Sequence, residues 1–222
     1  PEKAVWGKQV EVNDLPNLAL AGDRYYGPVQ TLGDWLEYSG SVMAIDPSGR
    51  GSDETAYAIV KMQNGILYVA DAGGISGGYS KDTLEHLVSL AKTYKVNYVT
   101  IESNFGDGMF TELIKPYFNK SYPCTLEEVR HSKQKELRII DTLEPIMNQH
   151  RLVIDPKVIE KDWKSVQHYP PEKASRYTLI HQMTRMSRER GAVAHDDRLD
   201  ALSMAVAYWV DQMAADADRQ ML

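Results

Sequence analysis

The sequence is short of cysteine and of long apolar runs. Cys124 is the single cysteine among 222 residues, which excludes an internal disulfide and a cysteine-built zinc site. The longest apolar stretch, "ALSMAVAYWV" from Ala201, falls far short of the roughly 20 residues that cross a bilayer, and no signal-peptide pattern follows Pro1. We therefore expect a protein of a reducing cytoplasm with no membrane segment.

Positive charge is also scarce. Lys and Arg total 25 against 31 Asp and Glu, for a formal net charge of −6, so the overall field is not typical of a nucleic-acid binder. The charges are unevenly spread, with basic residues at 130–138 and 185–190 and acidic residues at 195–200. Because an acid cluster that holds divalent cations gains positive charge once loaded, the negative total does not exclude DNA as a partner.

The first clear elements form a three-stranded antiparallel meander. The run "VMAI" before Asp46 is a short buried strand that stops at a glycine-rich turn. It is followed by "TAYAIVKM" and "ILYVADA", which are separated by Asn64-Gly65, a strong hairpin signal. Asp46 therefore ends the first strand, where capping of the turn is the simpler role for a lone aspartate.

Helices and strands alternate after the meander, which predicts parallel strands with right-handed crossovers. The fold class is thus α/β, with a mixed sheet flanked by helices. The predicted elements are a helix at 81–95 with Ser80 as N-cap, a strand at 96–102, a helix at 107–120 that Pro116 kinks or shortens, a short strand at 124–130, a helix at 132–149 with Leu137, Ile140, Leu143 and Ile146 facing inward, an extended piece at 151–155, and a buried helix that starts at Asp196 or Asp197.

Carboxylates from distant parts of the chain are expected to meet in one cleft. Ligands of such sheets collect outside the carboxyl ends of strands, and both Asp46 and Glu102 end predicted strands. The late helix adds Asp196, Asp197 and Asp200, whose spacings of three and four place pairs of them on one helical face. Capping and the helix dipole explain one of these aspartates, but explain three less well.

Converging carboxylates repel one another, and a divalent cation removes the repulsion. Ligands that are all oxygen favour Mg²⁺ or Mn²⁺. Two such ions would support in-line hydrolysis of a phosphodiester, with Asp46 bridging both ions, Glu102 completing one site and Asp197 the other. These three are the predicted catalytic residues.

Four further residues leave alternatives open. Lys133 and Arg138 either hold substrate phosphates or lie on a solvated helix face. His195 is either a general base or ligand, or a structural residue before the helix. Asp53 leans toward the metals or is a solvated loop acid.

Four stretches occur in order: "VMAIDPSGRGSDETAYAIV", "VNYVTIESNFGDG", "SKQKELRIIDTLEPIM" and "HDDRLDALSMAVAYW". Together they resemble the nuclease domain of the large terminase subunit of tailed phages, most closely the T7-like type. The resemblance implies an RNase H-like fold, an endonuclease that cuts concatemeric genomic DNA in the cytoplasm of the infected bacterial host, and the portal and small terminase subunit as partners. By motif, the family's acids fall on Asp46, on Glu102 and within Asp196-Asp197, with Asp200 as a further ligand.

Large terminase subunits also carry a packaging ATPase, yet no stretch here matches GxxxxGK[ST]. We therefore expect residues 1–40 to be an arm or linker from an absent ATPase domain, residues 41–212 to be the nuclease domain, and residues 213–222 to be an acidic C-terminal tail. Two other functions stay open from the residues alone. One is an actin-like or sugar-kinase-type ATPase, for which the chain is short, and the other is a non-catalytic docking module of the packaging motor.

Overall fold

The structure, a computed structural model, describes residues 1–8, 10–48, 53–103 and 108–221. The glycine-rich turn predicted after Asp46 lies largely outside these residues. Within them, no helix combines the length and the apolar character that a bilayer crossing demands.

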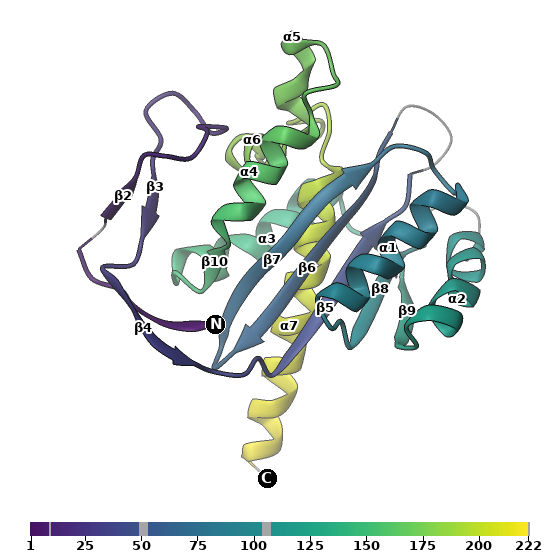
Figure 1. Ribbon diagram of the computed structural model, residues 1–222, viewed down its shortest axis with the longest axis horizontal. Helices are drawn as coiled ribbons and strands as arrows, with labels where there is room; N and C mark the ends of the chain where they lie inside the picture. The colour runs from purple at the N-terminus through teal and green to yellow at the C-terminus, as the bar shows by residue number, and fades with distance from the viewer. Residues whose placement is uncertain (9, 49–52, 104–107, 222) are drawn as a thin grey trace.

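A six-stranded mixed sheet forms the centre of the molecule (Figure 1). The predicted meander β5–β6–β7 is antiparallel, whereas β8 runs parallel to β5, β9 parallel to β8, and β10 parallel to β7. In sheet order the strands are β10 (Leu152–Ile154), β7 (Ile66–Ile75), β6 (Thr55–Gln63), β5 (Gly40–Asp46), β8 (Tyr98–Glu102) and β9 (Thr125–Val129). Asn64 and Gly65, between β6 and β7, have φ of 51° and 78°, as a type I′ hairpin turn requires.

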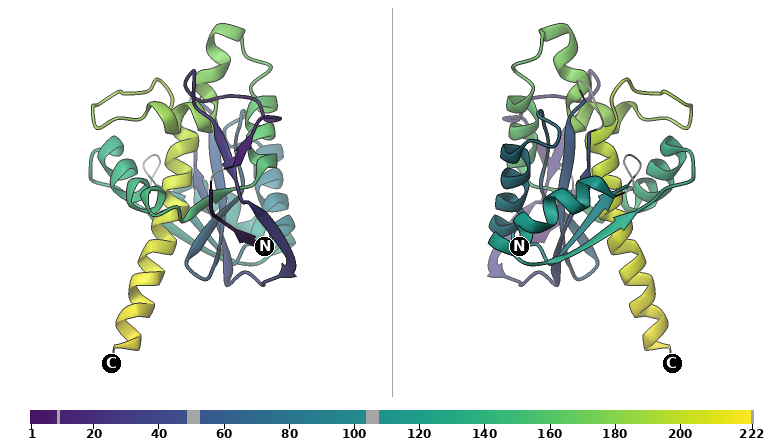
Figure 2. Two further views of the ribbon diagram at one scale, coloured as in Figure 1. Left: turned by 90° about the vertical axis from the view of Figure 1, so that its left-hand side faces the viewer. Right: turned by 90° about the vertical axis from the view of Figure 1, so that its right-hand side faces the viewer.

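Helices cover both faces of the sheet, as predicted. The views of Figure 2 place α3 (Lys135–Asn148) and α7 (Asp197–Gln220) on one side, and α1 (Lys81–Thr93) and α2 (Met109–Ser121) on the other. The hydroxyl of Ser80 accepts a hydrogen bond from the Thr83 backbone N–H and so caps α1. α2 continues through Pro116 and does not end there.

β5 is buried on both faces because it lies between these two helix layers. Val42 and Ala44 pack in the core beneath α7, whereas Met43 and Ile45 pack beneath α1 and α2, and all four are at most 1% exposed. Such a strand reads as a continuous apolar run rather than an alternating one. The same burial fixes the position of Asp46 at its end.

α7 crosses one face of the sheet and then projects beyond it (Figures 1 and 2). Its first half is buried nearly all round, from Arg198 to Val206, as its apolar sequence predicts. The acidic segment predicted as a tail at 213–222 continues this helix as far as Gln220.

Three features add to the sequence predictions or differ from them. Residues 1–40, predicted as an arm or linker, contain two strand pairs: β1 (Glu2–Val5) pairs with β4 (Gln30–Trp35), and β2 (Val10–Val12) pairs with β3 (Tyr25–Gly27). The region after β10, for which no element was predicted, contains α4 (Pro156–Ser165), α5 (Pro171–Ala174), a 3₁₀ helix (Ser175–Tyr177) and α6 (Leu179–Arg185).

The third concerns α3. It begins at Lys135, and Ile139 takes the buried face with Leu143 and Ile146, while Leu137 and Ile140 are only half-buried. Spacings of four and three make these three buried positions the true inward face.

Candidate metal centre

Asp46 and Glu102 end neighbouring parallel strands at the same edge of the sheet. Ile45 pairs in register with Ile101, so the next residue of each strand emerges side by side. Asp46 and Glu102 are 9% and 5% exposed. Asp46 Oδ2 has no hydrogen-bond partner among the described residues, which marks it as a buried oxygen that could accept a cation.

Asp200 brings a third carboxylate to this edge from the first turn of α7. Its side chain is fully buried, and one ligand atom from each of Asp46, Glu102 and Asp200 lies within 4.8 Å of the others. Asp196 is the N-cap residue of α7 and Asp197 its first helical residue. We call these five side chains the carboxylate cluster.

Lys135, at the start of α3, binds four members of the carboxylate cluster. Its Nζ lies 2.8 Å from Asp196 Oδ1, 3.1 Å from Asp200 Oδ2, 3.6 Å from Asp46 Oδ2 and 3.9 Å from Asp197 Oδ1. Burial would lower the pKa of Lys135, but the negative charges of Asp200, Asp46 and Asp196 raise it instead, so the amine stays charged.

Arg138 lies one turn further along α3 and also faces the cluster. Its two terminal nitrogens donate to Asp200 at 2.8 and 3.1 Å, and one lies 3.5 Å from Glu102 Oε1. A bidentate pair of this kind fixes both partners. Arg138 is therefore not on a solvated helix face, whereas Lys133 is exposed and precedes α3.

The carboxyl groups of Asp46 and Glu102 have opposite shifts in pKa. Burial raises the pKa of Asp46 well above its usual range, although Lys135 opposes it. Burial would also raise the pKa of Glu102, but hydrogen bonds from His131 and Asp46 and nearby cations outweigh it and bring the pKa to about 2. The pair thus favours one proton on Asp46 and an ionised Glu102, as expected for two carboxyls that share a site.

Asp197 and Asp200 of α7 also have raised pKa values. Burial raises the pKa of Asp197 to about 6, with Lys135 opposing and the charges of Asp196 and Asp53 adding to the effect. Burial likewise raises the pKa of Asp200. Asp53 is exposed and acts on the cluster through its charge.

Sequence reasoning missed Lys135 and His131. His131, in the loop before α3, is hydrogen-bonded through Nδ1 to Glu102 Oε1 at 3.0 Å. Lys135 and Arg138 are three residues apart, the spacing of one helical face, and this was the signal that could have grouped them. Nothing in the local sequence around His131 indicates its partner. His131 reaches Glu102 because it follows β9, which pairs with the strand β8 that ends at Glu102.

A second buried charge cluster lies on the other side of the first turn of α7. Arg198 is fully buried and binds Glu54 through Nε and Nη2, at 3.0 Å each, and Asp162 through Nη1 at 2.9 Å. Asp162 also accepts hydrogen bonds from the backbone N–H groups of Leu179 and Ile180. We call Arg198, Glu54 and Asp162 the Arg198 cluster.

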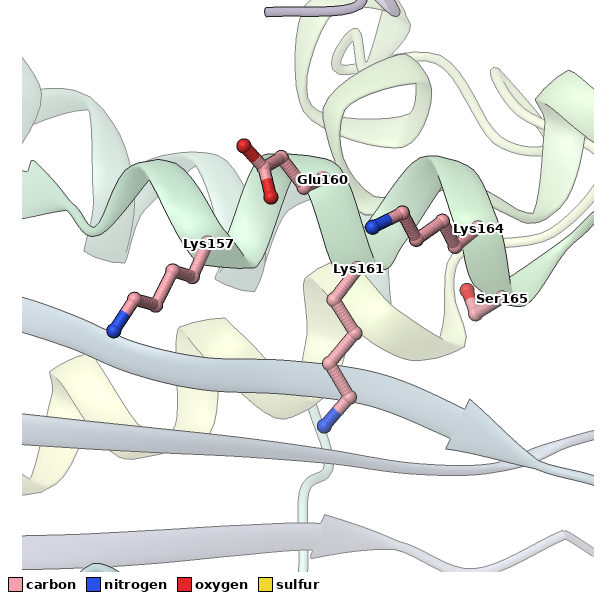
Figure 3. A pocket seen from close by; sticks show the side chains of 5 residues that line it. All are labelled: Lys157, Glu160, Lys161, Lys164 and Ser165. Atoms are coloured by element: carbon pink, nitrogen blue, oxygen red, sulfur yellow. The ribbon is translucent and has the colours of Figure 1, made fainter.

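A hollow along α4 is chemically different from both clusters. It encloses about 340 Å³ and is lined by Lys157, Glu160, Lys161, Lys164 and Ser165 (Figure 3). Lys161 points from α4 toward the sheet, where its Nζ lies 2.7 Å from Asp71 Oδ2. The hollow contains no member of the carboxylate cluster.

The architecture defines a class of protein, and comparisons with known proteins agree with it. Three carboxylates at the ends of two parallel strands and at the start of a helix across the sheet characterise an RNase H-like domain. Solved structures share this fold: the human cytomegalovirus terminase nuclease domain, soaked with manganese and bound to an inhibitor (TM-score 0.54, 13% identity, 77% of this chain and 83% of that one), and the nuclease domain of the large terminase subunit of bacterial virus Sf6 (TM-score 0.54, 14% identity, 78% and 90%).

Sequence comparison identifies the family. Residues 45–152 match the model of the ribonuclease H-like domain of the bacteriophage T7 terminase. Over 213 residues the chain is 46% identical to the terminase large subunit of Enterobacteria phage T3, which covers 95% of this chain but 36% of that relative. The chain belongs to the family of RNase H-like terminase nuclease domains, as the four sequence stretches predicted. It spans about a third of the length of the curated relative it matches.

Proposed function

We propose that this domain is a metal-dependent DNA endonuclease that hydrolyses phosphodiesters of concatemeric genomic DNA during packaging. The observation that carries the proposal is the convergence of Asp46, Glu102 and Asp200 within 4.8 Å, with a buried oxygen of Asp46 left without a hydrogen-bond partner among the described residues. Family membership supports it. Related nuclease domains have been solved with such ions: that of cytomegalovirus soaked with manganese, and that of Sf6 with manganese and with calcium.

The donor set fits hard divalent cations, because every candidate ligand is a carboxylate oxygen. We propose that Asp46, Glu102 and Asp200 hold one Mg²⁺ or Mn²⁺, and that Asp196 and Asp197 help hold a second. When bound, two such ions activate a water and stabilise the leaving oxygen of the phosphodiester.

The protein side chains around the ions have separate tasks. The bidentate bond from Arg138 fixes the orientation of Asp200, and His131 fixes that of Glu102. Lys135 offsets the repulsion between carboxylates, and its ammonium group competes with a divalent cation for the same oxygens. Lys133, exposed two residues before Lys135 in the chain, stays our candidate for a contact to a DNA phosphate.

Nicking of supercoiled plasmid in Mg²⁺ or Mn²⁺ tests the proposal. Wild type should nick, whereas Asp46→Asn and Glu102→Gln should not, because each removes a ligand charge without changing shape. Asp141→Asn is the matched control, since Asp141 is exposed and pairs with Arg188 away from the cluster. Nicking that survives both substitutions would remove the proposal, and metal-dependent ATP turnover without nicking would favour an ATPase.

The biological setting follows from the family and is part of the same proposal. Double-stranded DNA is the expected substrate, the portal and small terminase subunit are expected partners, and the cytoplasm of an infected bacterial host is the expected location. A packaging ATPase is expected on the part of the terminase polypeptide that this chain does not include. Residues 1–40 would be the linker toward it.

A further inference from the structure

Four aromatic rings form a continuous stack beside the start of α7. His168 and Tyr169 follow α4, Tyr177 ends the 3₁₀ helix, and His195 directly precedes the N-cap Asp196. Ring centroids are 4.0 Å apart for His168 and Tyr169, 3.9 Å for Tyr169 and Tyr177, and 4.0 Å for Tyr177 and His195. The last two pairs are nearly parallel, at 5° and 23°. The stack ties the residue before Asp196 to the segment after α4.

Hydrogen bonds provide a second link between the stack and α7. The hydroxyl of Tyr169 donates to Glu54 Oε1 at 3.0 Å, and Glu54 accepts two hydrogen bonds from Arg198. Gly74 leaves room for this, because a Cβ there would lie 1.9 Å from Glu54 Oε2. Arg198 directly follows Asp197. Ring stacking before the helix and hydrogen bonding within it therefore hold both sides of the turn that carries the three aspartates.

The two histidines near the carboxylate cluster use different parts of their rings. His131 presents a nitrogen on its ring edge to Glu102. Among the described residues, the contact that the structure gives His195 is the stack of its ring face on Tyr177. This stacking contact requires an aromatic ring but does not require a ring nitrogen.

We infer that His195 is a positioning residue: its ring, stacked on Tyr177, holds the N-terminal turn of α7 so that Asp196 and Asp197 face the metal centre. This inference rests on the proposed function, since it concerns ligands of the same ions. It assigns to His195 neither proton transfer nor metal ligation. Stacking of one aromatic pair corresponds to a change of about two- to tenfold in an equilibrium constant.

Three substitutions of His195 separate the roles. His195→Phe keeps a flat ring without nitrogens, His195→Gln keeps polar atoms without a ring, and His195→Ala keeps neither. We expect Mn²⁺ affinity, measured by isothermal titration calorimetry, to stay within about twofold of wild type for His195→Phe and to fall about two- to tenfold for the other two. Plasmid nicking should follow the same order.

The control and the partner variants use the same stack. His168→Ala removes the exposed outer ring and should leave Mn²⁺ affinity unchanged. Tyr177→Ala should weaken Mn²⁺ binding as His195→Ala does, and the double variant should be no worse than either single one, because both break one contact. Tyr177→Phe should behave as wild type.

The outcomes distinguish this inference from the proposed function. Loss of Mn²⁺ affinity in His195→Phe with retention in His195→Gln would overturn the inference and assign the nitrogen a role. Equal affinity in all three variants would also overturn it. A wild type that binds Mn²⁺ with the expected order of variants, but never nicks DNA, would support the positioning role while removing the nuclease. A wild type that binds no Mn²⁺ overturns both.

Discussion

The carboxylate cluster and the Arg198 cluster flank the same turn of α7 and are built in opposite ways. In the Arg198 cluster every carboxylate oxygen of Glu54 and Asp162 accepts a hydrogen bond. In the carboxylate cluster five acids face Lys135 and Arg138, and Asp46 Oδ2 and Arg138 Nε have no hydrogen-bond partner among the described residues.

The comparison shows that the unpaired buried charge around this turn lies in the carboxylate cluster and not in the Arg198 cluster. Buried polar groups are normally paired, and exceptions gather at functional sites. The Arg198 cluster holds helices α4, α6 and α7 to the sheet, whereas the carboxylate cluster is held together against its own repulsion. Removing an acid from the carboxylate cluster should therefore lower activity without lowering stability. Removing the cation of the Arg198 cluster should lower stability.

The largest effect is expected from Asp46→Asn. Nicking should fall roughly a thousandfold or more, since one ligand supports several kcal/mol of transition-state stabilisation. The thermal midpoint of the metal-free protein should stay the same or rise, because a neutral side chain relieves the burial cost that raises the pKa of Asp46. Plasmid nicking and calorimetry measure the two quantities, and a large loss of stability would break the comparison.

Arg198→Met should lower the stability of the protein. It leaves Glu54 and Asp162 buried without their cation, so the free energy of unfolding should fall by about 3–5 kcal/mol, measured by urea denaturation. The matched control is Arg188→Met, which removes an exposed arginine that pairs with Asp141 and Glu144 and should change stability little. Equal effects of the two substitutions would show that the Arg198 cluster is not a structural anchor.

Lys135→Ala sharpens the comparison within the carboxylate cluster. Removing the competing ammonium group should tighten Mn²⁺ binding roughly tenfold, while the metal-free protein loses stability because its carboxylates repel. Lys157→Ala, in the hollow beside α4, is the control. Weaker Mn²⁺ binding by Lys135→Ala would mean that Lys135 supports the ions instead of competing with them.

The smallest effect is a dependence on pH. The pKa of Asp197 is about 6 in the folded protein, above its ordinary 3.8, so its ionisation disfavours the metal-free fold as pH rises from about 4 through 6. Metal binding needs the ionised form. The rise in thermal midpoint caused by Mn²⁺ should therefore grow between pH 5 and 7, and grow less in Asp197→Asn. A rise that shrinks over this range would contradict the assignment.

The sequence predicted the parts of the site that follow from chain geometry. Asp46 and Glu102 end runs whose apolar character predicts buried strands, and the parallel pairing on which their proximity depends is present in the structure. Asp200 stands out because it lies in the first half of α7, which is buried nearly all round.

The missed parts depend on tertiary packing. Lys135 and His131 reach the cluster only because β9 and α3 return to the sheet beside β8. α4 has ten residues and buries Val158, Ile159 and Asp162 on one face, a helical period that the sequence reasoning overlooked. α5 has four residues and α6 seven, too few for a hydrophobic period to develop. The strands at residues 1–40 have three to six residues and are largely exposed, which leaves no alternating pattern to detect.

Crystals soaked in Mn²⁺, with the ions located by anomalous scattering, test the central assignment most directly. We predict that manganese lies between Asp46, Glu102 and Asp200, with a second ion toward Asp196 and Asp197. Manganese bound elsewhere on the protein, with these carboxylates left unligated, would contradict the account.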